Sequence, residues 1–197
     1  MKRRNVKNVR IVKRLLERPD GTWTKYKLAK ASGCTRQWVI QFLRKLEEMD
    51  LVEGTQVRDP MGLIRYGAEA TAKPIKVLNL FHTEPVDFVK KHTDRYAFTT
   101  YAAENMVTHH LFPSRYDVYL EMDAMHEVYE RTFIEGWLGM GNTRLIVPVD
   151  GTILDDVRLV SDVKVVGMGQ LMIDLVKEGG VAEEAVQEMV RRDVWQR

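Results

Sequence analysis

Helical spacing of apolar residues marks the start of the chain. From residue 5 to residue 18, apolar positions recur every three or four residues: Val9, Val12, Leu15 and Leu16. The segment Pro19-Asp20-Gly21 ends this run, and a second short run covers residues 26–32 before Gly33, a suitable left-handed helix cap. The pattern predicts two helices, at residues 5–18 and 26–32.

A third helix is predicted from residue 35, where Thr35 can act as the N-cap. Its apolar positions form one stripe at helical spacing: Val39, Phe42, Leu43, Leu46 and Met49. A hairpin is predicted next, with strands at 55–57 and 63–66. The intervening segment 58–62 contains Pro60 and Gly62, which suit a turn.

Small residues and Pro74 at positions 67–74 indicate a seam between two domains, residues 1–70 and 71–197. Beyond the seam, short helical and extended patterns alternate. Strands are predicted at 96–99, 115–123, 144–149, 157–160 and 164–166, and helices at 85–91, 101–109, 124–134, 170–177 and 182–192. The fold class expected for the chain is therefore α+β, with an α+β domain at its C-terminal end.

Charge is divided unequally between the two predicted domains. Residues 1–70 contain 16 Lys and Arg against 8 Asp and Glu, a net charge of +8, whereas residues 71–197 contain 14 against 20, a net charge of −6. The first 45 residues hold 14 basic side chains and 2 acidic ones. This asymmetry indicates a polyanionic partner for the first domain, with a solubilising basic terminus as the alternative.

Three helices followed by a hairpin, with a Gly-containing turn before the third helix, resemble a winged helix-turn-helix. The sequence LAKASGCTRQWVIQFLRKLEEMDLVEG carries this resemblance, which covers residues 5–68. The resemblance implies an N-terminal domain that binds double-stranded DNA and a sequence-specific transcriptional regulator. Some winged helices bind proteins instead, so a pure interaction module is an alternative function.

Candidate DNA-binding residues lie opposite the apolar stripe of the third helix. Arg36, Gln37 and Gln41 are predicted to contact bases, because Arg pairs with the guanine edge and Gln with the adenine edge of the major groove. Further contacts to the DNA backbone or minor groove are predicted for Arg44 and Lys45 on the same helix and for Arg58 and Arg65 on or near the predicted wing. A solvated charged face is the alternative interpretation.

The stretch RYDVYLEMD, residues 115–123, would place Asp117, Tyr119, Glu121 and Asp123 on one face of a strand. The predicted order of a strand, a helix and a strand that carries acidic residues resembles that of the nucleotidyltransferase superfamily. In that superfamily a Gly-Ser pair binds phosphate and a pair of acidic residues binds a metal ion. Thr99-Thr100 and Tyr119 depart from that pattern. We expect a degenerate, non-catalytic domain, with an Mg²⁺-dependent nucleotidyltransferase as the alternative.

A second resemblance concerns residues 96–103 and 165–176, with Gly179-Gly180 and a Glu-rich final helix. This order is similar to the C-terminal domain of AbiEi-type antitoxin regulators, in which it follows a winged helix. The matching motif is Gln170-Leu171-x-x-Asp174-Leu175. The resemblance implies repression of an operator and neutralisation of a nucleotidyltransferase-like toxin. By themselves, Gln170 and Asp174 lie one helical turn apart and can hydrogen-bond to each other.

Partners and location follow from these patterns. Double-stranded DNA is the expected partner of the N-terminal domain, and a cognate toxin or another protein is the expected partner of the C-terminal domain. The expected assembly is a homodimer. No apolar run reaches the length of a membrane span and no apolar h-region follows the basic start, so a cytoplasmic protein is expected. One cysteine, Cys34, argues against a disulfide or a cysteine metal site. We expect no cofactor, metal site or catalytic residue.

Overall fold

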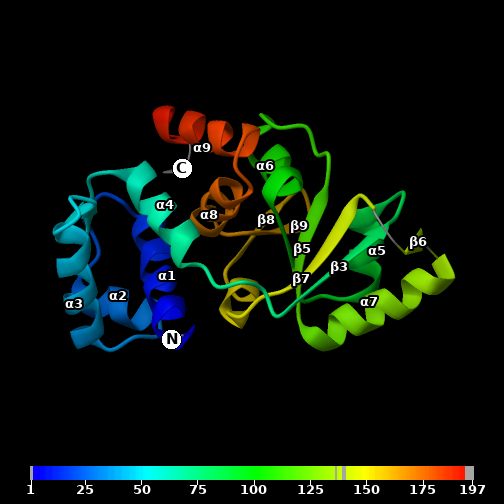
Figure 1. Ribbon diagram of the computed structural model, residues 1–197, viewed down its shortest axis with the longest axis horizontal. Coiled ribbons are helices and arrows are strands. Elements are labelled where there is room, and N and C mark those ends of the chain that lie inside the picture. The colour runs from blue at the N-terminus through cyan, green and yellow to red at the C-terminus, as the bar shows by residue number, and fades with distance from the viewer. Residues whose placement is uncertain (1, 136, 139–140, 194–197) are drawn as a thin grey trace. The chain divides into compact units, whose positions relative to one another are not determined.

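The computed structural model describes residues 2–135, 137–138 and 141–193. The chain forms two compact units, one made of residues 1–72 together with residues from 168 onward, the other of residues 73–167. Each unit contains helices and strands, so the fold is mixed α and β (Figure 1). The last two helices belong to the first unit, together with the N-terminal helices.

The first unit opens with the three helices expected from the sequence: α1 (Lys2–Glu17), α2 (Lys25–Ala31) and α3 (Arg36–Glu47). Gly33, between α2 and α3, has a φ of 60°, as a left-handed cap requires. The hydroxyl oxygen of Thr35 accepts a hydrogen bond from the backbone N–H of Trp38 at the start of α3. The predicted stripe of α3 is buried except for Met49, which lies beyond the helix and is exposed.

The predicted wing is wrong after its first strand. The hairpin consists of β1 (Val52–Glu53) and β2 (Gln56–Val57), and the expected return strand at 63–66 lies within a helix, α4 (Pro60–Ala70). Two local features start this helix: the Asp59 carboxylate accepts from the N–H of Gly62, and Pro60 occupies the first turn. Leu63, Ile64 and Gly67 then provide a buried face at helical spacing.

Two C-terminal helices complete the first unit: α8 (Met168–Glu178) and α9 (Val181–Arg191). Residues 168–175 of α8 are all buried, because the helix packs against α1, α4 and α9. Glycines permit the close approach of its neighbours. A Cβ at Gly169 would lie 2.7 Å from the Lys13 carbonyl oxygen on α1, and one at Gly67 of α4 would lie 2.8 Å from Ile173 Cδ1.

In the second unit, seven strands of the described residues form one mixed sheet. They are β3 (Lys76–Phe81), β4 (Tyr96–Thr99), β5 (Tyr116–Leu120), β6 (Trp137–Leu138), β7 (Thr143–Val147), β8 (Val157–Val160) and β9 (Val163–Val166), in the order β6-β3-β7-β5-β4-β9-β8. No strand was predicted from the sequence at the position of β3. The central strand β5 runs antiparallel to β4 and parallel to β7.

Helices connect the strands of this unit: α5 (Pro85–His92), α6 (Thr100–Thr108) and α7 (Met122–Glu135), with a short 3₁₀ helix at Gly151–Leu154. The helix α6 packs against β4 and β5, while α7 packs against α5 and β7. Strand β5 ends at Leu120, earlier than predicted, because α7 begins two residues later. Residues 121 and 123 therefore do not extend the strand.

Candidate nucleic-acid interface

The helix α3 is fixed to α1 through Trp38. Its indole Nε1 donates a hydrogen bond of 3.0 Å to Oδ1 of Asn8, and the Lys7 ammonium lies 5.3 Å from the centre of the indole ring. In the turn before α3, burial raises the pKa of the Cys34 thiol, which donates to the carbonyl oxygen of Ser32 at 3.3 Å. These contacts hold the turn and the first part of α3 in a defined position.

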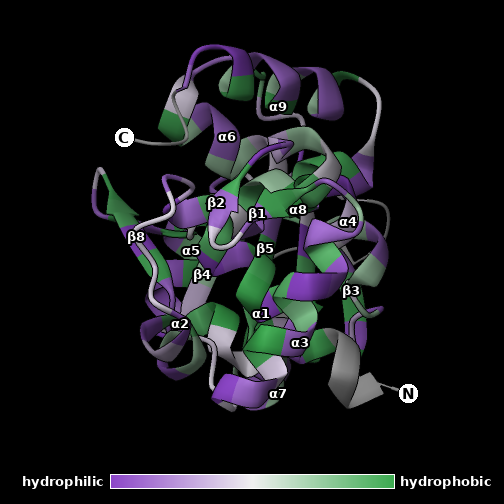
Figure 2. Cartoon of the chain, turned by 90° about the vertical axis from the view of Figure 1, so that its left-hand side faces the viewer, coloured by the Kyte–Doolittle hydropathy of each residue, from purple (hydrophilic) through white to green (hydrophobic). Residues whose placement is uncertain are grey.

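Four of the predicted DNA-binding residues form the exposed face of α3: Arg36, Gln37, Gln41 and Arg44. Within the described parts of the chain, their side chains make no hydrogen bond or ion pair. Figure 2 shows α2 and α3 with hydrophilic residues alternating with hydrophobic ones. The exposed face therefore offers two guanidinium groups and two amides to an external partner.

Lys45 continues the same face toward the end of α3 and is also exposed. Its ammonium lies 3.4 Å from the hydroxyl oxygen of Tyr66 and 5.3 Å from the centre of that ring. The ring of Tyr66 in turn lies 5.8 Å from that of Phe42. The Lys45 ammonium thus contacts an aromatic side chain at the surface.

Arg58 and Arg65 differ from the α3 residues because acidic side chains face both. Arg58 follows β2 and forms an ion pair with Glu53 of β1. The prediction that Arg65 lies on or near a wing strand is wrong: Arg65 lies on α4, and its Nε and Nη2 donate to Oε1 of Glu183 at 3.0 and 2.8 Å. Both guanidinium groups are exposed but locally neutralised.

Sequence reasoning missed a set of exposed side chains on α2. Lys25, Tyr26, Lys27 and Lys30 are all exposed, whereas Leu28 and Ala29 of the same helix are buried. The available signal was the spacing of three lysines in a helix of seven residues that precedes the turn. Because α2 packs against α3, these cations add to the basic surface of the same three-helix segment.

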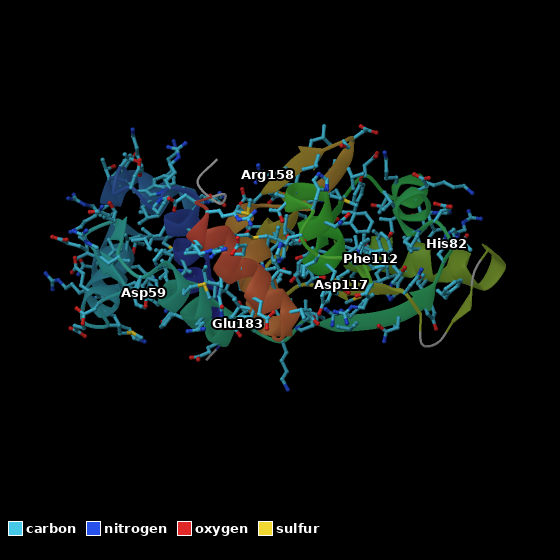
Figure 3. All side chains as sticks on the ribbon, turned by 90° about the horizontal axis from the view of Figure 1, so that it is seen from above. Asp59, His82, Phe112, Asp117, Arg158 and Glu183 are labelled. Carbon is cyan, nitrogen blue, oxygen red and sulfur yellow. The ribbon has the colours of Figure 1, made fainter. Side chains whose placement is uncertain are left out.

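The acidic row of residues 115–123 does not exist as one face. Asp117, labelled in Figure 3, is fully buried. Its oxygens accept from Arg115 at 2.7 and 2.9 Å, from Arg144 at 2.8 and 2.9 Å, and from the hydroxyl of Thr100. Glu121 is exposed and pairs with Arg95 at 2.8 Å, and Asp123 lies in the first turn of α7.

The row is therefore divided among a buried ion cluster, a surface pair and a helix start. Across the described ranges, no three His, Cys, Asp or Glu side chains are grouped as metal ligands would be.

Comparisons with known proteins yield no relative. No family model, no curated protein and no solved structure matches the chain. Among the described helices, none combines the length and the apolar character that crossing a membrane requires.

Proposed function

We propose that this chain is a sequence-specific regulator that binds double-stranded DNA through α2, the turn and α3. The observation that supports the proposal is the exposed face of α3, where Arg36, Gln37, Gln41 and Arg44 lack partners among the described side chains. Basic and amide side chains in that arrangement match the donor and acceptor pattern of base edges and phosphates.

Different residues have different roles in this proposal. Arg36, Gln37 and Gln41 lie in the first two turns of α3 and contact base edges in the major groove. Arg44 and Lys45, nearer the helix end, contact phosphates. The lysines of α2 add phosphate contacts, as expected for the helix that precedes a recognition helix. The excess of 14 basic over 2 acidic residues in the first 45 positions supplies the long-range attraction.

The test is selection of the full-length protein on a pool of random DNA duplexes, followed by a salt titration on the enriched sequence. We expect a consensus sequence whose affinity falls steeply with salt. A palindromic consensus, with half-sites about 34 Å apart, would support the predicted homodimer. If the protein retains no duplex even at low salt, the proposal is overturned. An acidic protein is then the favoured partner of this face.

Neutralisation of a toxin, which the AbiEi resemblance implies, stays a prediction. The two polar residues of the matching motif are buried in α8, and Gln170 Nε2 donates to Oδ1 of Asp174 at 2.8 Å. This bond within the helix agrees with the one-turn spacing seen in the sequence. A toxin would therefore have to contact other residues, and co-purification with a nucleotidyltransferase-like protein encoded beside this gene would test the idea.

A further inference from the structure

The indole of Trp38 contacts two consecutive residues of α1. The ammonium of Lys7 lies 5.3 Å from the centre of the ring, and Oδ1 of Asn8 accepts the hydrogen bond from Nε1 at 3.0 Å. The backbone of α1 is held here as well, because Sγ of Cys34 in the turn before α3 lies 4.0 Å from the carbonyl oxygen of Lys7. The second turn of α1 is therefore attached to the beginning of α3.

The bond to Trp38 determines how the Asn8 amide is oriented. An indole N–H can only donate, so its partner on Asn8 is the oxygen, and the two N–H donors on Nδ2 are left for another acceptor. Within the described ranges, neither these donors nor the Lys7 ammonium has a hydrogen-bond or ion-pair partner. All three side chains are partly exposed, so a ligand at the surface can reach them.

Trp38 borders the exposed face of α3 that is proposed to contact DNA. Gln41 follows it by three residues and Lys45 by seven, and both spacings place side chains on the same side of a helix. Lys7 and Asn8 therefore lie beside that face. The charged residues of α1 that precede Glu17 are all basic, so this part of α1 adds positive charge to it.

We propose that Lys7 and Asn8 bind one phosphate of the DNA backbone, next to the bases contacted by α3, and that Trp38 positions the Asn8 amide and supports Lys7. This inference rests on the proposed binding of DNA by α3. An ammonium and an amide NH₂ group both donate, and a phosphodiester offers negatively charged acceptor oxygens. Side chains that are already held in place lose less conformational entropy on binding. The helix α1 thereby helps to set the register of α3 on the duplex.

The test measures binding of the full-length protein to the duplex enriched by selection, in which one phosphate at a time is replaced by an uncharged methylphosphonate. Lys7→Ala is expected to weaken binding to the unmodified duplex about threefold or more. It should also reduce the slope of log affinity against log salt by about 1. At the phosphate that Lys7 contacts, the methylphosphonate weakens binding of the wild-type protein but should cause no further loss in Lys7→Ala.

The matched control is Lys177→Ala, which removes an exposed lysine from α8 of the same unit. Its affinity is expected to stay within about twofold of wild type, with the same pattern of losses along the duplex.

Two further variants test Asn8 and Trp38. Asn8→Asp keeps an oxygen acceptor for Trp38 but replaces the amide donors by a negative charge. It should weaken binding at least as much as Lys7→Ala, and the methylphosphonate at the same position should relieve this repulsion. Trp38→Phe keeps a ring beside Lys7 but removes the N–H that orients Asn8. Its effect on affinity should disappear in the Asn8→Ala background.

A single phosphate that identifies both α1 residues supports the contact. Full additivity of Lys7→Ala with every methylphosphonate overturns it, while DNA binding by α3 would stand. Additive effects of Trp38→Phe and Asn8→Ala in folded protein overturn the positioning role of Trp38. If the wild-type protein binds no duplex, the proposed function fails and this inference fails with it.

Discussion

The arginines of α3 and the arginines beside β5 show how different settings give one side chain different roles. Arg36 and Arg44 are exposed and have no partner among the described residues, whereas Arg115 and Arg144 are anchored to a buried carboxylate. An exposed, unpaired charge contributes little to stability but acts strongly on a charged ligand. Arginines around a buried charge are held in a fixed geometry, and removal of that charge alone is strongly destabilising. The two sets should therefore respond to substitution in opposite ways.

The largest expected effect on stability is that of Asp117→Ala. The substitution leaves two guanidinium groups and the Thr100 hydroxyl without their shared acceptor. Loss of one partner of a buried ion cluster typically costs about 3–5 kcal/mol, and the partial exposure of both arginines favours the lower end, about 3 kcal/mol. Urea denaturation measures the change in the free energy of unfolding.

The matched control is Glu121→Ala, which removes an exposed carboxylate close by on the chain. Because its pair with Arg95 is at the surface, the expected cost is below about 1 kcal/mol. Equal losses for the two variants would show that the Asp117 cluster is no more important for stability than a surface ion pair.

Substitution on α3 should change DNA binding without changing stability. Arg36→Ala is expected to reduce the preference for the selected duplex over random DNA by about 1–3 kcal/mol, because a base contact is lost. Lys45→Ala should weaken binding to all duplexes and reduce the salt slope by about 1. Competition binding at several salt concentrations measures both quantities. Equal loss of specific and random binding in both variants would contradict these assignments.

The packing of α8 provides a contrast to both sets of arginines, because the closest contacts at Gly169 and Gly67 involve no charged group. Gly169→Ala places a Cβ 2.7 Å from the Lys13 carbonyl oxygen, and backbone atoms cannot move aside easily. Overpacking costs about 1–3 kcal/mol and the gain in helix propensity offsets about 1 kcal/mol, so a net loss of about 1 kcal/mol is expected. At Gly67 the nearest atom is Cδ1 of Ile173, a flexible side-chain end. Gly67→Ala should therefore cost less, and a larger cost for Gly67→Ala would contradict the packing argument.

Local signals explain why much of the first unit could be predicted. Thr35 and Gly33 determine where helices begin and end through their own hydrogen bonds and backbone angles, so their effects are visible in sequence. The stripe of α3 was correct for the same reason, except for Met49, which lies beyond the end of the helix. The segment 63–66 was assigned to the return strand of a hairpin because Pro60 and Gly62 suit a turn, although Asp59 and Pro60 also signal a helix start.

Non-local contacts explain what the sequence could not show. Arg115 and Arg144 are separated by 28 intervening residues and meet at Asp117 because β5 and β7 are adjacent in the sheet. The packing of α8 with α1 likewise depends on contacts between opposite ends of the chain. Alternation along β5 suggested an exposed acidic face, but a central strand is covered on both sides, and the charge of Asp117 is compensated within the sheet.

The smallest expected effect is that of Arg65→Ala. On a wing strand this residue would contact DNA, but on α4 its guanidinium is bonded to Glu183. DNA affinity should stay within about twofold of wild type, because an exposed ion pair is worth about 0–1 kcal/mol and the charge is already compensated. Arg44→Ala, an exposed arginine of α3, is the matched control and should weaken binding to every duplex. If Arg65→Ala weakens DNA binding as much as Arg44→Ala, Arg65 must leave Glu183 in the complex, and the DNA contact surface then extends from α3 to α4.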